Sequence, residues 1–382
     1  MKYITTILFF CSFLFTAPLQ ALSVEIAASV FPVWLLLRSV AQNVPDAHVS
    51  LILPASTGCP HDYAPTPQDR KKLATCDILV INGLGLESFL GEGERLKSIL
   101  KKGAVVVDAS RGCAGLLPGG HPAEGGADHP VQDRPQGSRQ DLAQGMDPEH
   151  GAAHRHEEEH GHEHGSATEG EHEGMHGEHK HLHDEGHEGM HGHEHAGHGE
   201  HGHHHDHGPL NPHIFASPSM MGQMAESVAR QLADADPAHA GRYLENARAF
   251  RQEMDALAGE FRQALAGAGR KSALVQHNIF DYLARDAGLE IDGLIQRHEG
   301  VDPSARELLD LARLIRSRGT AIIITEPQYP ARNGEMLARE TGIPCISLDP
   351  VAGGPENAPL DHYARCMRSN LKILRQAFGI QK

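Results

Sequence analysis

The stretch DILVINGLGLESFLGEGERLKSILKKGAVVVDAS, residues 77–110, carries the pattern from which the fold can be inferred. Two runs of branched apolar residues, ILVI (78–81) and VVV (105–107), show no polar alternation, which is typical of strands buried on both faces. Between them, residues 85–103 predict one helix. A strand, a helix and a second strand in this order predict two parallel strands with the helix packed across them.

The same alternation of strands and helices extends through most of the chain. A first series runs over residues 22–115 and a second over residues 268–382, with a long helix expected at about 239–266 between them. The further strands expected are VEIAAS (24–29), VSLIL (49–53), SALVQ (272–276), LEIDGLI (289–295), AIIIT (321–325) and PCISL (344–348). The sequence therefore predicts an α/β fold with two lobes, each a parallel-type sheet covered by helices, joined by a long helix.

Two helix starts can be placed from their capping residues. Ser217 followed by Pro218 is typical of an N-cap and a first helical position. Asp302 is expected in the same way to cap a helix over residues 302–319.

A histidine-rich segment interrupts the first series. Residues 121–207 hold 23 of the 30 histidines, together with 20 acidic and 4 basic residues and no aromatic residue. Acids and bases balance in the rest of the chain, so the net charge of -16 belongs to this segment and argues against a nucleic-acid partner. Such a composition cannot bury enough apolar surface to offset the entropy of ordering, which predicts a disordered insert over residues 116–208.

The insert contains the pattern H-E-x-x-H three times, at 156–160, 172–176 and 187–191. In a metalloprotease this pattern needs a stable helix that directs both imidazoles at one zinc ion. Here the copies stand among glycines, and a segment made of His, Glu and Gly produces them by composition. A weak, multi-site metal collector is the preferred interpretation, because neutral imidazole binds zinc and later divalent metals well. A solvated polar tether is the alternative.

The first 21 residues are typical of a secretory signal peptide. Lys2 provides a basic start, residues 4–17 an apolar core, and residues 19–21 a cleavage site. No later apolar run reaches 18 residues. We therefore expect a soluble protein exported to the periplasm.

Export permits disulfide bonds, and five cysteines remain after the signal peptide. The favoured pair is Cys345 with Cys366, joining a strand to the last helix. Cys59 with Cys113 is a second pairing, since both follow expected strands. The odd number leaves at least one thiol unpaired within the chain.

Four candidate metal ligands share one kind of position. His61, in the loop after strand VSLIL, and His277, at the end of strand SALVQ, lie where chains leave a parallel sheet. Asp349 follows strand PCISL, and His213 precedes a helix. Ligands of open α/β sheets gather at the carboxyl ends of strands. Three imidazoles and one carboxylate form a four-ligand set suited to Zn²⁺.

The motifs around these residues resemble the metal-specific solute-binding proteins of ABC transporters, of the zinc-uptake ZnuA type. They are HDYAPTPQD (61–69), INGLGLESFL (81–90), NPHIFASP (211–218), QHNIFDYLARDAGL (276–289), TEPQYPARNGEMLARETG (325–342) and LDPV (348–351). The resemblance runs from about residue 24 to the C-terminus, apart from the insert.

The resemblance implies a domain organisation and a set of partners. It implies a first lobe at 22–115 and 209–238, a rigid linking helix at 239–267 and a second lobe at 268–382. One metal ion would lie in the cleft, with His61 and His213 from the first lobe and His277 and Asp349 from the second. The protein would act as a monomer with the permease and ATPase of an ABC transporter, and not as an enzyme.

Two positions depart from the pattern of this family. Asn211 stands where the family usually has an aspartate, and Pro60 stands where some zinc-binding members have a glutamate that reaches the metal. Because Pro60 offers no carboxylate to the metal, Asp349 is the expected fourth ligand. Cys59 and water are the alternatives.

The leading hypothesis is a periplasmic protein that captures Zn²⁺ for import. A periplasmic zinc buffer or metallochaperone, in which the insert is the active part, is one alternative. A manganese-binding protein is another, although His277 is softer than the carboxylate that manganese prefers. A zinc hydrolase would need a general base, and Glu326 is the only carboxylate near enough in sequence to consider.

Overall fold

The computed structural model describes residues 23–58, 60, 63–91, 93–119, 209–296 and 301–380. All of them belong to one compact unit. The expected signal peptide, residues 120–208 of the expected insert with the three H-E-x-x-H copies, Cys59 and His61 lie outside the described residues. Within the described ranges, no helix has the length and apolar content needed to cross a membrane.

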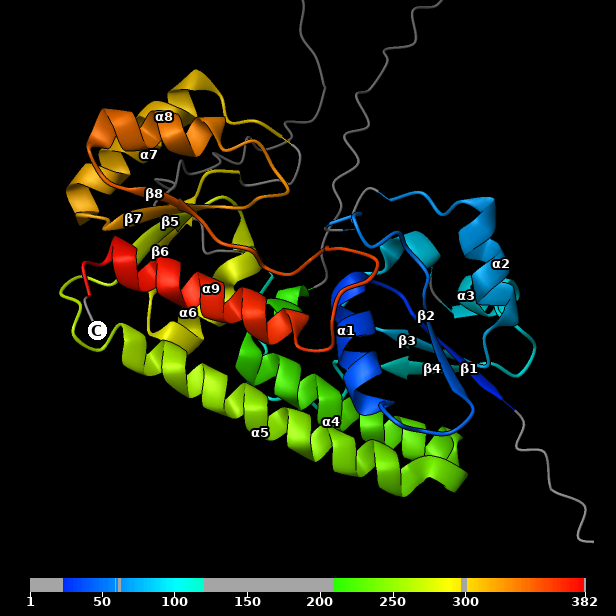
Figure 1. The fold of residues 1–382 in the computed structure, drawn as a ribbon. Coiled ribbons are helices and arrows are strands. Elements are labelled where there is room, and N and C mark those ends of the chain that lie inside the picture. The colour runs from blue at the N-terminus through cyan, green and yellow to red at the C-terminus, as the bar shows by residue number, and fades with distance from the viewer. Residues whose placement is uncertain are drawn as a thin grey trace, which may run out of the picture. The chain divides into compact units, whose positions relative to one another are not determined.

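The first lobe is built on a four-stranded parallel sheet in the order β2-β1-β3-β4 (Figure 1). Its strands are β1 (Val24–Ala28), β2 (Ala47–Leu51), β3 (Ile78–Ile81) and β4 (Val105–Asp108). The connecting helices are α1 (Phe31–Val40), α2 (Pro67–Thr75) and α3 (Gly93–Ile99).

The second lobe repeats this arrangement in a parallel sheet of order β6-β5-β7-β8. Its strands are β5 (Ser272–Val275), β6 (Glu290–Leu294), β7 (Ile322–Thr325) and β8 (Cys345–Ser347). Its helices are α6 (Asp281–Ala287), α7 (Ala305–Arg318), α8 (Arg332–Thr341) and α9 (His362–Ala377). The predicted α/β fold with two lobes is confirmed.

In each sheet the strand order reverses once. The chain passes from β1 outward to β2 and then returns to β3 on the other side, and β5, β6 and β7 do the same. Connections on the two sides of the reversal cover opposite faces of the sheet and leave a crevice at the carboxyl ends of the central strands. The two places where a ligand is expected are therefore the ends of β1 and β3 and the ends of β5 and β7.

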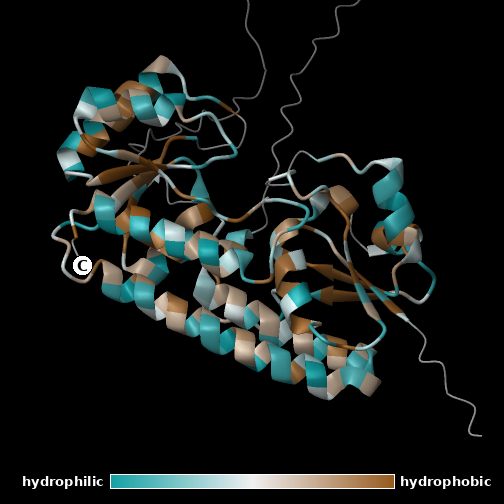
Figure 2. Cartoon of the chain, in the orientation of Figure 1, coloured by the Kyte–Doolittle hydropathy of each residue, from teal (hydrophilic) through white to brown (hydrophobic). Residues whose placement is uncertain are grey.

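Two long helices connect the lobes. α4 (Pro218–Ala235) and α5 (Ala240–Ala264) pack along each other, and α5 also contacts α1 of the first lobe and α6 and α9 of the second. At 25 residues α5 is about 37 Å long, from a rise of about 1.5 Å per residue. Apolar residues fill the strands of both sheets (Figure 2), and one hydrophobic cluster runs from the first sheet through α4 and α5 to α9.

Two details of the predicted helices are wrong. The single helix expected over residues 85–103 is interrupted at Gly91, whose φ of +72° is left-handed and ends a short 3₁₀ turn (Ser88–Leu90) before α3. The helix expected to be capped by Asp302 is capped by Ser304, which forms a capping box with Glu307. Asp302 instead accepts a hydrogen bond from Asn333 at the start of α8.

The disulfide expected between Cys345 and Cys366 is also wrong, because both thiols are free. Successive side chains of a strand point to opposite faces of the sheet. Cys345 packs with the small cluster under α7 and α8, whereas Ile346 and Cys366 pack against the main cluster. The two sulfurs therefore lie on different faces of the second sheet. Cys113 is a free thiol as well, and its proposed partner Cys59 lies outside the described residues.

Candidate metal centre

His213 lies in a buried turn that the first lobe holds in place. It begins the 3₁₀ turn η2 (His213–Ala216), directly before the N-cap of α4. Asn82, which follows β3, donates from Nδ2 to the Pro212 carbonyl oxygen at 2.9 Å. The His213 side chain is fully buried. The turn is therefore fixed at the carboxyl end of β3, one of the two expected ligand positions.

A buried carboxylate supports this anchor. Glu87 accepts hydrogen bonds from the Ser29 hydroxyl at 2.6 Å and from the backbone N–H groups of Asn82 and Gly83 at 2.6 and 3.2 Å. Burial raises the pKa of Glu87 to about 7, although these three hydrogen bonds act to lower it. Glu87 thus connects the ends of β1 and β3 beneath the turn that carries His213.

His277 is placed by the pairing of β5 with β7. Val275 pairs with Ile324, so the residues two positions further on, His277 and Glu326, emerge side by side. Glu326 Oε1 lies 2.6 Å from His277 Nδ1, and both residues are only 2% exposed. A carboxylate at one ring nitrogen orients the imidazole and leaves the other nitrogen to bind a metal.

The structure brings His213 and His277 together from the two lobes. Their ring centroids are 5.7 Å apart and the ring planes are inclined by 77°. Tyr329 packs edge-on against His277, with ring centroids 5.4 Å apart. His213 Nδ1 lies 2.9 Å from Asn211 Oδ1. Each imidazole thus has one ring nitrogen next to an oxygen of a neighbouring side chain.

Asp349 follows β8, the strand next to β7, and is half-buried. Its Oδ1 accepts hydrogen bonds from the Val351 N–H at 2.8 Å and from Gln328 Nε2 at 3.4 Å. Asn370 of α9 holds the backbone of Asp349 on both sides. Within the described part of the chain, no three His, Cys, Asp or Glu side chains lie close enough to hold one metal ion. Of the three predicted ligands that the structure describes, it therefore brings His213 and His277 together and leaves Asp349 outside their cluster.

The loop that leads to His61 packs against the loop that carries Asp349. Gly354 N–H donates to the Ala55 carbonyl at 2.8 Å. A Cβ on Gly58 would lie 3.4 Å from Cγ of Gln328, the residue that donates to Asp349. The described chain preceding His61 thus ends beside the second lobe.

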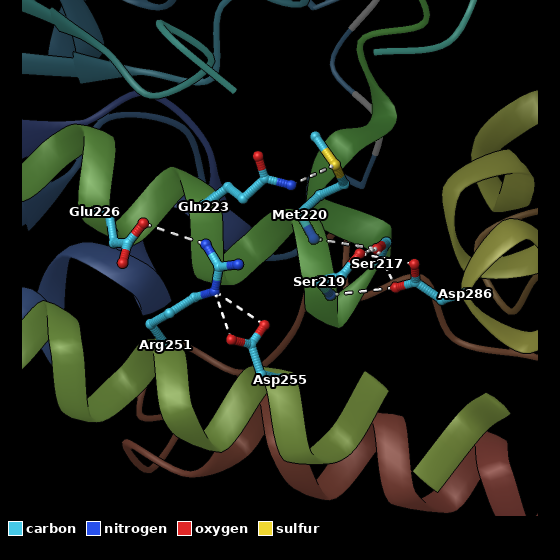
Figure 3. Close-up of polar contacts among 8 residues, drawn as sticks. All are labelled: Ser217, Ser219, Met220, Gln223, Glu226, Arg251, Asp255 and Asp286. Carbon is cyan, nitrogen blue, oxygen red and sulfur yellow. Dashed lines mark hydrogen bonds and ion pairs between the residues drawn. The ribbon is translucent and has the colours of Figure 1, made fainter. Parts of the chain in front are cut away.

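The start of α4 is clamped by the second lobe. Asp286 of α6 accepts hydrogen bonds from the hydroxyls of Ser217 and Ser219 at 2.6 and 2.7 Å, as Figure 3 shows. Ser217 is also the N-cap of α4, as predicted, and accepts from the N–H of Met220. Since Ser217 directly follows η2, this clamp limits the movement of His213 relative to α6.

The two ends of the insert are paired with each other next to this centre. Pro118 and Leu210 form an antiparallel bridge, Gly119 N–H donates to the Pro209 carbonyl at 3.0 Å, and Asn211 N–H donates to the Leu117 carbonyl at 2.8 Å. The insert therefore leaves and rejoins the first lobe at one place, and the returning chain reaches His213 four residues after Pro209.

Sequence reasoning found both buried histidines but not their supporting residues. Glu326 was considered only as a general base, whereas in the structure its carboxylate faces Nδ1 of His277. Asn211 was noted only as a departure from a family pattern, and it contacts His213 directly. The position of Glu326 directly after β7 is a usable signal, but it requires knowing that β5 and β7 are neighbours.

Comparison with known proteins agrees with this structure. The chain is 26% identical over 358 residues to the zinc-binding protein AdcA of Streptococcus pyogenes serotype M3. The aligned region covers 92% of this chain and 55% of that protein. This chain thus spans about half the length of the curated relatives it matches.

Solved structures share the fold. FpvC of Pseudomonas aeruginosa, solved with Mn²⁺, matches with a TM-score of 0.62 and 21% identity over 93% of this chain and 98% of that one. A zinc-bound variant of AdcAII of Streptococcus pneumoniae matches with a TM-score of 0.61 and 20% identity over 93% of this chain and 98% of that one. These similarities concern the fold alone, and it is shared by structures that hold different metals.

The family model of the periplasmic component A of the zinc-uptake complex, ZnuA, matches residues 26–377. The resemblance found in the sequence motifs is thereby confirmed. This chain belongs to the ZnuA family.

Proposed function

We propose that this chain is a periplasmic binding protein that captures Zn²⁺ between its two lobes and delivers it to the permease and ATPase of an ABC transporter. The observation that carries the proposal is the buried pair His213 and His277, in which each ring has one nitrogen within 2.9 Å of a neighbouring side-chain oxygen. Imidazoles oriented in this way are suited to bind zinc through the remaining nitrogen. The names of the family and of the AdcA relative support the same cargo.

We assign His61 and Asp349 as the ligands that complete the site. The hydrogen bond from Gly354 to Ala55 supports this assignment because it joins the loop that leads to His61 with the loop that carries Asp349. For Asp349 to bind zinc, its hydrogen bond to Gln328, already long at 3.4 Å, would be exchanged for a bond to the metal.

The ligand set favours binding over catalysis and zinc over manganese. Three imidazoles with one carboxylate are softer than the oxygen-rich sets that manganese prefers. A zinc hydrolase would need a base able to deprotonate bound water. Glu326 is a poor candidate because it is buried with its carboxylate against His277.

Zinc titration of purified variants tests the site. His213→Ala and His277→Ala should each weaken tight binding by about 100-fold or more, because each removes one of about four ligands. His48→Ala is the matched control, since His48 is exposed at the amino end of β2, opposite the carboxyl ends where ligands are expected. Binding by His213→Ala that equals the parent protein would show that the site is placed wrongly.

The insert, we propose, collects metal for this site. Its 23 histidines can each offer a neutral imidazole, and its ends are paired next to His213. Deleting residues 121–207 should remove weak zinc sites and leave the tight site, and the deletion strain should import zinc poorly only when zinc is scarce. Loss of the tight site on deletion would instead support a zinc buffer in which the insert is the active part.

A further inference from the structure

Asn211 has hydrogen-bonding partners for its whole side-chain amide. Its Oδ1 accepts from the backbone N–H of His213 and faces His213 Nδ1, both at 2.9 Å. Its Nδ2 donates to the Asn278 carbonyl and to Asp281 Oδ2, both at 2.9 Å. The residue is fully buried. An amide has two donors and two acceptor sites, so this side chain has no capacity left over.

These partners fix which end of the amide faces His213. If oxygen and nitrogen were exchanged, Nδ2 would face the N–H of His213, and the oxygen would face the Asn278 carbonyl and the Asp281 carboxylate. Two donors would then face each other at His213, and acceptors would face each other at Asn278 and Asp281. Each buried polar group left without a hydrogen-bond partner lowers the unfolding free energy by about 1–3 kcal/mol. The observed orientation therefore presents an oxygen to His213 Nδ1, so that Nδ1 must be the protonated nitrogen. Nε2 is left with the lone pair.

The same amide connects the two lobes at the metal centre. Asn211 precedes His213 by two residues, and its partner Asn278 directly follows His277. The Tyr282 hydroxyl of α6 donates to the Asn211 carbonyl at 2.8 Å, and Asn278 Nδ2 donates to the Gly119 carbonyl at 2.9 Å. A network that joins the neighbours of both histidines holds their separation before any metal binds.

We propose that Asn211 is a positioning residue for the metal site. It directs Nε2 of His213 to the metal, and it sets the spacing of His213 and His277 across the lobes. This inference rests on the proposed function. A carboxylate at position 211 could accept from His213 but could not donate to Asn278 and Asp281. It would also place a second negative charge about 3 Å from Asp281, which is strongly unfavourable in a buried site. Asp281 thus explains why an amide is required here.

A charge-exchange experiment tests the proposal with Zn²⁺ as the probe. N211D should weaken zinc binding by about 10- to 100-fold, the usual effect of losing a supporting contact of a metal-binding histidine. Adding D281N should restore most of the affinity, because the donor and the acceptor are then exchanged between the two positions. N246D is the matched control, since Asn246 Nδ2 also donates to two backbone carbonyls, of Val40 and Gln42, but away from the site.

The tautomer of His213 provides a readout that does not depend on zinc. Nitrogen NMR of the metal-free parent protein should show His213 protonated at Nδ1, and N211D should perturb this signal while N246D should not. Protonation at Nε2 would overturn the inference, as would parental zinc affinity in N211D or a failure of D281N to restore it. If the parent protein bound no zinc tightly, the proposed function would fail while the tautomer measurement still decided the role of Asn211.

Discussion

Replacing Glu326 by glutamine measures how much the carboxylate behind His277 contributes to zinc binding. The change preserves the size of the side chain and one oxygen acceptor, and it removes the negative charge 2.6 Å from Nδ1. A negative charge beside one ring nitrogen makes an imidazole a better metal ligand through the other. Losing such a partner typically costs about 10- to 100-fold in metal affinity, which corresponds to about 1.4–3 kcal/mol. Because both groups are buried, solvent does not screen the effect appreciably.

Competition of the protein with a zinc chelator of known affinity is the suitable assay. E335Q is the matched control, because Glu335 is exposed on α8 and its loss removes the same charge from the same lobe. Thermal unfolding of the metal-free variants checks that each remains folded. If E326Q bound zinc within twofold of the parent while His277→Ala lost binding, the carboxylate would have no part in supporting His277.

Two further predictions concern stability. Burial raises the pKa of Glu87 to about 7 from an ordinary value of 4.5, so its ionisation opposes folding, and stability present at low pH is lost as the pH rises through 7. At about 1.4 kcal/mol per pKa unit, the loss of unfolding free energy is about 3 kcal/mol. Glu87→Gln should therefore flatten the dependence of the unfolding free energy on pH, measured by urea unfolding between about pH 5 and 8. An unchanged slope of unfolding free energy against pH would contradict this. Ser304→Ala removes the capping box of α7 and should lower the unfolding free energy by about 1 kcal/mol. Ser317→Ala, on the exposed end of the same helix, serves as its control, and an equal loss in both variants would show that the cap contributes nothing.

Much of this fold could be predicted from the sequence because buried parallel strands have an unmistakable pattern. The run ILVI at 78–81 is buried as predicted, whereas VVV at 105–107 is not buried on both faces, because β4 is an edge strand on which Val105 and Val106 are exposed. The broken helix at Gly91 was missed because a single glycine is compatible with a helix, and only its left-handed backbone shows the interruption. The cap of α7 was missed because Asp302 and Ser304 are both good N-cap residues and tertiary contacts chose between them.

The histidines of the site were predictable, but their environment was not. His277 was found because it ends a strand, and His213 because it stands between a proline and a capped helix. The partners Asn211 and Glu326 depend on which strands are neighbours and on how the lobes meet, and neither is written in local sequence. The same limit explains the incorrect disulfide, since the face on which Cys345 points is decided by strand pairing and packing.

The pairing of Gly119 with Pro209 affects how chains of this kind can diversify. The backbone leaves the first lobe and returns to it at residues that are hydrogen-bonded to each other. Any segment that joins them begins and ends at nearly one point, so its length and composition can change without moving either lobe. The junction of Gly119 and Pro209 is thus a permissive position. Natural variation can accumulate there freely, and an experimenter can insert a fluorescent domain at it. A reporter grafted there would be attached four residues before His213, close enough to sense the arrival of a metal ion.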